Sequence, residues 1–367
     1  MPDMRFAPPN PLRIADRAVG MNAVAIRSHN ERLVLSLLLQ NDGMSRMAIG
    51  QRTGLSAQTI SVLVRSLERE GLVSQGEAQR GRIGPPTIPL SLNSEGAYSV
   101  GISIGHVKTH VVLIDFIGKV KFHTEIDNIP PGDKSNQSKF LATVKAAVAA
   151  LPQENKRRIA GIGLALPEDS HELSLAPSGA SERHEALREE IETALGIEVY
   201  VQNDINAAAA GESLFGAAKP MSDYLYCYLG ARLQFRLILN HQIFNGVSQM
   251  SYDVGLIRLE KALKAADQDT SVLWERGANW PDFGAIEADW QATCVQQIEE
   301  VLTLLGQFVP VKTVVLSSYA PKKTCETITR TLMDRIAGIE AVAGILDISP
   351  KAIGAASLPF SSKFIVE

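Results

Sequence analysis

The sequence predicts an α/β protein with a small helical domain at its N-terminus and a larger body of two lobes behind it. Amphipathic helices follow one another closely in the first ninety residues and end in a short basic segment with glycine and proline. From Tyr98, and again from about Ser222, strands in a hairpin come first, and strands and helices then alternate. A repeated order of this kind is typical of two α/β lobes. The length of 367 residues allows two or three domains at about 100–200 residues each.

The charge is distributed unevenly along the chain. Residues 1–90 contain eleven arginines, no lysine and seven acidic residues, a net charge of +4, whereas the remainder has a net charge of −8. A basic end on an acidic body indicates that only this end binds a polyanion. Chance variation in surface charge is the alternative.

The apolar runs and the cysteine positions indicate the cellular compartment of the protein. We find no apolar run near the ~20 residues of a membrane span, and residues 1–20 lack the apolar segment of a signal peptide. The cysteines Cys227, Cys294 and Cys325 are far apart, which fits a reducing cytoplasm and gives no disulfide or metal pattern. We therefore expect a cytoplasmic protein without a membrane partner.

Three helices are predicted in the N-terminal domain, after a proline-containing arm at residues 1–25. The first contains "HNERLVLSLLLQ" and stops at Asp42-Gly43. Ser45 can cap the second, which stops at Gly54, and Ser56 can cap the third, because a serine hydroxyl accepts an otherwise unpaired backbone N–H. The spacing of the apolar residues in the third helix directs one face to the core. These residues are Ile60, Leu63, Val64 and Leu67.

The second and third helices form a helix-turn-helix, and the segment "SQGEAQRGRIGPPTIPLSL" after them is typical of a hairpin wing. Small polar residues let the third helix enter the major groove, where Gln58 could pair with adenine. Arginines at the wing tip suit the negative potential of a narrow minor groove. A helical hairpin used only for packing or dimerisation is the alternative. The predicted DNA-binding residues are Ser56, Gln58, Thr59, Ser61 and Arg65 on the helix, with Arg80, Gly81 and Arg82 at the wing tip.

The body is expected to have the actin-like, ribonuclease-H-like architecture. The segment after Tyr98 predicts three strands in a meander, "RIAGIGLALP" a buried strand, and "IEVYVQND" a strand that leads directly into the helix "INAAAAGESLFGA". This junction directs the side chains of Asn203 and Asp204 beyond the tip of the strand. The second lobe begins with hairpin strands and contains a long helix, "ADWQATCVQQIEEVLTLLGQFVP", before the strand "VKTVVLSSYAP".

From about Ile26 to its C-terminus, the chain resembles the ROK family, which groups sugar-responsive repressors with sugar kinases. The repressor branch is similar at "SRMAIGQRTGLS" and at the passage from the wing through "LSLN" into "VGISIG". The body resembles the family at "GIGLALP", "NDINAAAAGE" and "KAIGAASLP". The resemblance implies a winged helix-turn-helix domain at residues 26–95 and a ligand-binding, oligomerising body at residues 96–367. Its first lobe would span about 96–220 plus 350–367, and its second about 221–349.

The chain departs from the family at each of the three loops that hold ATP in a kinase. Ser103 replaces the acid near Mg²⁺, "GARLQFR" replaces a glycine-rich phosphate turn, and "LSSYAP" replaces the glycines below the adenosine. Glycine in such loops permits close approach to a ligand, so we expect bulkier residues to close the site. Phosphoryl transfer also needs a positioned metal ion, so no catalytic residue and no cofactor are expected.

Most of the family has a structural zinc site just after the sugar loop, but "SYDVGLIRLEKALKAADQ" contains neither cysteine nor histidine. The histidines elsewhere, among them His106, His110, His123, His171, His184 and His241, are scattered and are interpreted as structural or surface residues. No metal site is therefore expected.

The resemblance implies sugar contacts at four positions. Asn203 and Asp204 match the Asn-Asp pair that binds sugar hydroxyls, and capping of the following helix is the alternative role for this pair. Asp253 stands where the family has a sugar-binding glutamate, and Ser178 where an asparagine often contacts sugar. A carboxylate suits a vicinal diol, because it accepts from two hydroxyls.

We therefore expect a transcription regulator, most simply a repressor of carbohydrate genes. It would bind an inverted-repeat operator as a homodimer or homotetramer and respond to a small carbohydrate or derivative. A sugar kinase with a DNA-binding adaptor, and a regulator controlled by a protein partner with a vestigial cleft, are the alternatives.

Overall fold

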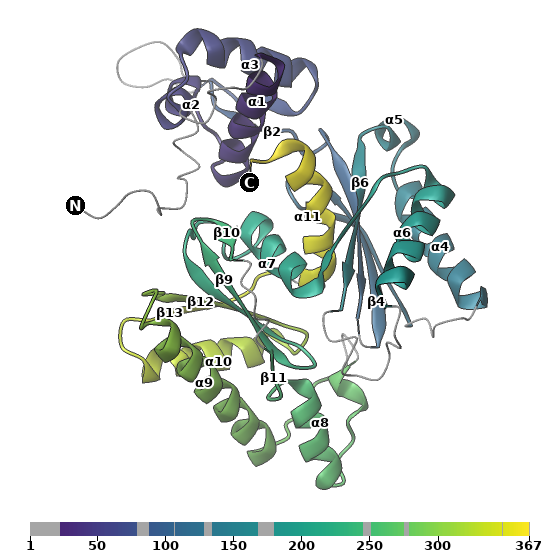
Figure 1. The fold of residues 1–367 in the computed structure, drawn as a ribbon, viewed down its shortest axis with the longest axis vertical. Helices are drawn as coiled ribbons and strands as arrows, with labels where there is room; N and C mark the ends of the chain where they lie inside the picture. The colour runs from purple at the N-terminus through teal and green to yellow at the C-terminus, as the bar shows by residue number, and fades with distance from the viewer. Residues whose placement is uncertain are drawn as a thin grey trace.

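The computed structural model describes residues 23–78, 88–105, 107–127, 134–167, 180–244, 251–274, 279–346 and 348–366. Figure 1 shows the small N-terminal domain against one of two α/β lobes. The helices α7 (Asp204–Phe215) and α11 (Pro350–Phe364) lie between the two lobes.

The N-terminal domain is a winged helix-turn-helix. The side chain of Ser45 accepts the N–H of Ala48, and that of Ser56 accepts the N–H of Thr59, so both predicted caps are confirmed. Gly54 ends the second helix with a φ of 71°, a conformation that glycine adopts without strain. The wing strands pair in antiparallel register, Val73 opposite Leu92. The elements are α1 (Ala23–Gln40), α2 (Arg46–Thr53), α3 (Ala57–Arg69), β1 (Val73–Gln75) and β2 (Leu90–Leu92).

A mixed sheet forms the centre of the first lobe, with the strand order β5-β4-β3-β6-β7. The first three strands of this order are antiparallel, whereas β3, β6 and β7 are parallel. Helices α4 and α6 cover one face of the sheet and α11 covers the other (Figure 1). The elements are β3 (Tyr98–Ile104), β4 (Lys108–Asp115), β5 (Val120–Asp127), α4 (Lys134–Ala149), α5 (Gln153–Lys156), β6 (Ile159–Leu166), α6 (Ala180–Leu195) and β7 (Val199–Asn203).

The second lobe has a sheet of order β10-β9-β8-β12-β13, and β11 also pairs with β9. Its outer face packs on α8, α9 and α10, and its inner face packs on α7 of the first lobe. The elements are β8 (Tyr224–Leu229), β9 (Leu233–Leu239), β10 (Gln242–Ile243), β11 (Ser251–Tyr252), α8 (Leu256–Ala265), a 3₁₀ turn (Ser271–Leu273), α9 (Ala285–Leu305), β12 (Thr313–Ser318), α10 (Lys322–Arg335) and β13 (Glu340–Ala343).

The chain returns from the second lobe through α11, which packs on β6 and on α7 with backbone close to backbone. A Cβ atom added at Gly163 would lie 1.7 Å from the carbonyl oxygen of Ala355, and one added at Gly354 would lie 1.7 Å from that of Ala207. Glycine is therefore required at both positions.

One continuous apolar core joins the first lobe to the N-terminal domain through the C-terminal end of α11. Phe360 packs edge to face on Phe116, with ring centroids 5.3 Å apart, and both belong to the core that includes Val34 and Leu38 of α1. The backbone N–H of Val366 donates to the hydroxyl of Ser36, 2.9 Å away. The N-terminal domain is thus fixed to the end of α11.

The predicted class, a winged helix-turn-helix followed by an actin-like body, is confirmed. The sequence patterns predicted neither α10 nor β13, and α1 begins at Ala23, before the predicted start. The proline-containing arm up to residue 22 lies outside the described residues. No helix in the described ranges is long and apolar enough to cross a bilayer.

Gly163→Ala should destabilise the protein by about 3 kcal/mol, the upper end of the usual cost of overpacking, because the added methyl group meets backbone atoms that cannot rotate away. Gly338→Ala is the matched control: nothing lies within 4 Å of its added methyl group, and only the positive φ of 80° opposes it. This strain costs roughly 1–2 kcal/mol. Urea unfolding of both variants measures the difference. Equal losses of unfolding free energy in the two variants would show that α11 is not packed this closely.

Candidate functional site

The outward face of α3 is polar, as the sequence predicts. Gln58 and Arg65 are exposed, and Thr59 and Ser61 are partly exposed. The hydroxyl of Ser61 donates to the carbonyl oxygen of Ala57, 2.8 Å away. Side chains on this face are therefore available to a macromolecule at the surface.

Ser56 lies at the start of α3 and serves mainly the helix itself. Its hydroxyl accepts the N–H of Thr59 at 3.1 Å and lies 2.8 Å from the hydroxyl of the same residue. The sequence reasoning missed Val62, whose side chain is 56% exposed on the outward face. An apolar residue outside the buried spacing of the helix was the available signal. Such a side chain can contact a thymine methyl group.

The wing strands β1 and β2 pair in antiparallel register. Arg80, Gly81 and Arg82, predicted at the tip of their connecting loop, lie outside the described residues.

Between the lobes, the junction of β7 and α7 holds Asn203 at the end of the strand. Its side-chain oxygen accepts the N–H of Ile205 at 2.9 Å and the N–H of Asn206 at 3.2 Å. Asn203 therefore caps α7, which was the alternative role considered for it. Capping satisfies the unpaired N–H groups of the first turn.

Asp204 follows in the first turn of α7 and is 4% exposed. Its Oδ2 atom forms an ion pair with the ammonium of Lys351, from the first turn of α11, which also lies 4.5 Å from the ring centre of Tyr228. The Oδ1 atom is buried and has no hydrogen-bond partner among the described residues. A buried acceptor without a partner is unfavourable, so this oxygen is suited to receive a ligand hydroxyl.

The second lobe contributes Arg236, from β9, to the same junction. Its guanidinium donates to the side-chain oxygen of Asn206, to that of Asn203 at 3.2 Å and to the carbonyl oxygen of Phe235 at 2.7 Å. Donors and acceptors of both lobes thus converge at the start of α7. Sequence reasoning did not identify Lys351, Asn206 or Arg236 as members of this cluster.

Of the other two predicted ligand residues, Asp253 is paired outside this cluster. Asp253 is 59% exposed at its side chain, and its carboxylate lies 3.6 Å from the ammonium of Lys261 on α8. Ser178 lies outside the described residues.

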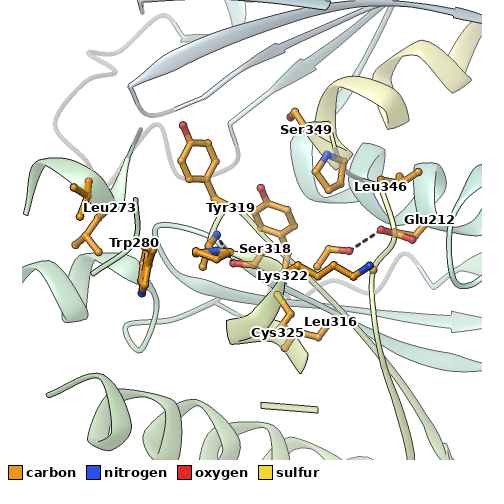
Figure 2. Close-up of a pocket in the computed structure, with 17 residues that line it drawn as sticks. Glu212, Leu273, Trp280, Leu316, Ser318, Tyr319, Lys322, Cys325, Leu346 and Ser349 are labelled. Atoms are coloured by element: carbon orange, nitrogen blue, oxygen red, sulfur yellow. Dashed lines mark hydrogen bonds between the residues drawn. The ribbon is translucent and has the colours of Figure 1, made fainter. Parts of the chain in front are cut away.

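A separate cavity of about 290 Å³ opens beside the end of β12 and the start of α10 (Figure 2). Tyr319, Trp280 and Lys322 are among its lining residues, whereas Asn203 and Asp204 are not. The loop "LSSYAP" borders this space. Ser103, at the first hairpin, is buried.

Glu212 lies at the inner wall of this cavity and ties α7 to the second lobe. Its carboxylate accepts the N–H of Ala217 at 2.8 Å and the hydroxyl of Ser317 at 3.0 Å. Burial raises the pKa of the Glu212 carboxyl, and these hydrogen bonds offset part of that effect.

Known proteins share both parts of this architecture. Residues 99–271 match the ROK family and residues 28–83 match the MarR family. The chain is 30% identical over 240 residues to a xylose repressor of Caldicellulosiruptor bescii, a match that covers 64% of this chain and 59% of the relative. It is 23% identical over 292 residues to the DNA-binding transcriptional dual regulator NagC of Escherichia coli K12, covering 78% of this chain and 68% of that protein.

The chain spans about three fifths of the length of the xylose repressors that it matches. A crystal structure of a ROK family transcriptional regulator, a homologue of the E. coli MLC protein, has the same fold. The TM-score is 0.64 at 16% identity, covering 92% of this chain and 98% of that one. The chain therefore combines a ROK family domain at residues 99–271 with an N-terminal MarR-type helix-turn-helix domain at residues 28–83.

Proposed function

We propose that this protein is a sequence-specific transcription regulator that represses genes of carbohydrate uptake or catabolism. A sugar or sugar derivative bound between the lobes would control its hold on operator DNA. The proposal rests on one observation above all: α11 pairs with the interlobe carboxylate at its first turn and packs on the DNA-reading domain at its last. At one end of α11, Lys351 contacts Asp204. Just beyond the other end, the backbone N–H of Val366 donates to the hydroxyl of Ser36 in α1.

The geometry of α11 supports transmission between the two sites. Its 15 residues span roughly 22 Å at the rise of an α-helix. Because its packing leaves no space for a methyl group at Gly163 or Gly354, it moves with its neighbours rather than sliding past them. A ligand that changes the Asp204–Lys351 pair would therefore shift the domain attached to the far end.

The chemistry of the interlobe cluster favours a polyhydroxyl effector. Asp204 offers an acceptor without a partner, while Arg236 and Lys351 supply charged donors nearby. Alternating donors and acceptors match the hydroxyls of a sugar or sugar derivative. Asp204 is buried, so the effector would enter when the lobes separate. Asn203 and Asp204 would hold the effector from the first lobe, Asp253 would approach it from the second, and Ser178 would complete the site.

The DNA-binding surface would consist of α3 and the wing. Gln58, Thr59, Ser61 and Arg65 would face the major groove and Ser56 would fix the helix start. Arg80, Gly81 and Arg82 would reach the neighbouring minor groove. A dimer or tetramer would place two such domains on an inverted repeat, with half-sites one or two helical turns apart.

The two alternative functions require different properties of the space between the lobes. A sugar kinase would need metal and phosphate positioning that Ser103 and "GARLQFR" do not supply. A regulator controlled by a protein partner would respond to no small carbohydrate. We therefore expect no ATP-dependent phosphorylation of sugars, and a response of the protein to a carbohydrate.

Changing Gln58 should alter base preference at one operator position. Selection from random duplexes should first yield an inverted repeat. Gln58→Ala should then reduce discrimination at one base pair of each half-site by about 1–3 kcal/mol, because it removes a base-edge contact. Electrophoretic mobility shifts on single-base operator variants measure this. Gln153→Ala, at an exposed glutamine of α5, should change nothing. An unaltered preference at every position would exclude Gln58 from base reading.

Asp204→Asn should weaken effector binding about 10–100-fold, because a hydrogen bond to a charged acceptor contributes roughly 1.5–3 kcal/mol. A panel of pentoses, hexoses, amino sugars and sugar acids should contain a compound that raises the melting temperature, since binding to the native state stabilises it. Titration with that compound, followed as operator release, gives the affinities. Asp289→Asn, at an exposed aspartate of α9, is the matched control. No response to any compound, or coinciding curves for the two variants, would contradict the proposed effector site.

A further inference from the structure

A cluster of two histidines and a glutamate lies on the first-lobe sheet, and none of its members is among the residues that line the cavity. His110 on β4 is the register partner of Glu125 on β5, and His123 pairs with Val112 two residues along. Alternate residues of a strand project from the same face, so His110, His123 and Glu125 share the face that α11 covers. Strand pairing therefore gathers residues that the sequence separates.

The three side chains approach one another through atoms that bind metal ions. Nδ1 of His110 lies 3.4 Å from Nε2 of His123 and 3.5 Å from Oε1 of Glu125, and the remaining separation, between His123 and Glu125, is 3.7 Å. A tetrahedral zinc ion with bonds of about 2.0–2.1 Å holds its ligand atoms roughly 3.3–3.4 Å apart. A tetrahedral ion over the three atoms would lie about 2.2 Å from each, slightly beyond the usual zinc–nitrogen distance and at the upper end of the zinc–carboxylate range.

The two imidazoles lie nearly parallel. Their planes differ by 8° and their centroids are 5.7 Å apart, and Nδ1 of His110 and Nε2 of His123 are 3.4 Å from each other. The same nitrogens can share a proton in a hydrogen bond when no ion is present. Because metal binding needs both lone pairs, protonation and metal binding compete.

We propose that His110, His123 and Glu125 bind a divalent transition-metal ion of the zinc class. Two imidazoles and one carboxylate suit zinc better than Mg²⁺ or Ca²⁺, which prefer oxygen ligands. Three protein ligands leave one tetrahedral position for water or for an oxygen atom of a ligand. The site lies in the first lobe, apart from "SYDVGLIRLEKALKAADQ", where the sequence lacks the family's zinc ligands.

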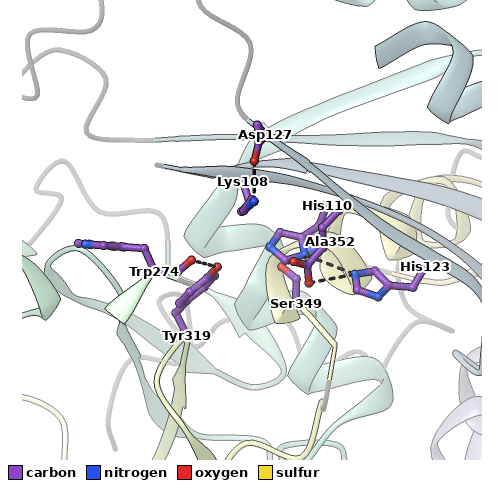
Figure 3. Close-up of polar contacts among 9 residues, drawn as sticks. Lys108, His110, His123, Asp127, Trp274, Tyr319, Ser349 and Ala352 are labelled. Atoms are coloured by element: carbon purple, nitrogen blue, oxygen red, sulfur yellow. Dashed lines mark hydrogen bonds and ion pairs between the residues drawn. The ribbon is translucent and has the colours of Figure 1, made fainter. Parts of the chain in front are cut away.

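The proposed site is open to solvent on one side and lies at the boundary between the two lobes. The side chain of His110 is 4% exposed, whereas those of His123 and Glu125 are each 24% exposed, so solvent reaches the cluster from their side. The ring of His110 also packs edge to face on Tyr319 of the second lobe, with centroids 6.3 Å apart. Figure 3 draws Tyr319 on one side of His110 and Ser349, the N-cap of α11, on another. A bound ion would thus fix a side chain that both lobes contact.

Direct metal titration of the full chain tests this site. Protein stripped with chelator should bind one equivalent of Zn²⁺ by calorimetry. Co²⁺ should give the visible absorption of a four-coordinate ion. His123→Ala should weaken the binding of Zn²⁺ and of Co²⁺ by at least about 100-fold, since loss of even an outer-shell partner weakens metal binding about 10–100-fold. Glu125→Gln, which keeps the shape and removes the charge, should also weaken binding, by at least about tenfold.

Matched variants separate this site from metal bound elsewhere. His241→Ala removes an exposed histidine of the second lobe and should bind like the wild type. Circular dichroism should show native folding for every variant, and His123 serves as the main test because it is only half-buried. Absence of saturable 1:1 binding by the wild type would overturn the proposal. Binding that persists in folded His123→Ala would overturn it equally.

Discussion

The close packing of α11 is the constraint on which the rest of this structure depends. The helix touches β6 and α7 at backbone distance, because glycine occupies the positions where a side chain would collide with carbonyl oxygens. Such a contact gains dispersion attraction between closely packed atoms, but α11 cannot shift part of the way without a clash. The first-lobe sheet, the interlobe helix α7 and α11 therefore act as one mechanical unit.

Both ends of that unit carry functional groups. At the lobe boundary, the ammonium of Lys351 forms an ion pair with the buried carboxylate of Asp204, and a buried charge without a partner would be unfavourable. At the other end, Phe360 and the segment after it belong to the apolar core that includes α1. The position of the N-terminal domain is thus coupled by packing to the environment of a single carboxylate, that of Asp204.

The second lobe contacts the unit through polar and aromatic side chains. Arg236 reaches Asn203 and Asn206, Ser317 reaches Glu212, and Tyr319 packs on His110. Contacts of this kind exchange more readily with water or ligand hydroxyls than a close-packed core does. The lobe boundary is therefore where ligand binding can alter the structure at the least energetic cost.

The sequence by itself determined the local features of this protein. The caps at Ser45 and Ser56, the turn at Gly54 and the apolar spacing of α3 are set by near neighbours, so the helix-turn-helix could be predicted. Strand alternation and the Asn-Asp junction likewise predicted the two lobes and the start of α7. Only the tertiary structure decided which distant side chains meet. Lys351 reaches Asp204 across 147 residues, and strand register gathers His110, His123 and Glu125. Such meetings depend on packing and register, which local patterns do not encode.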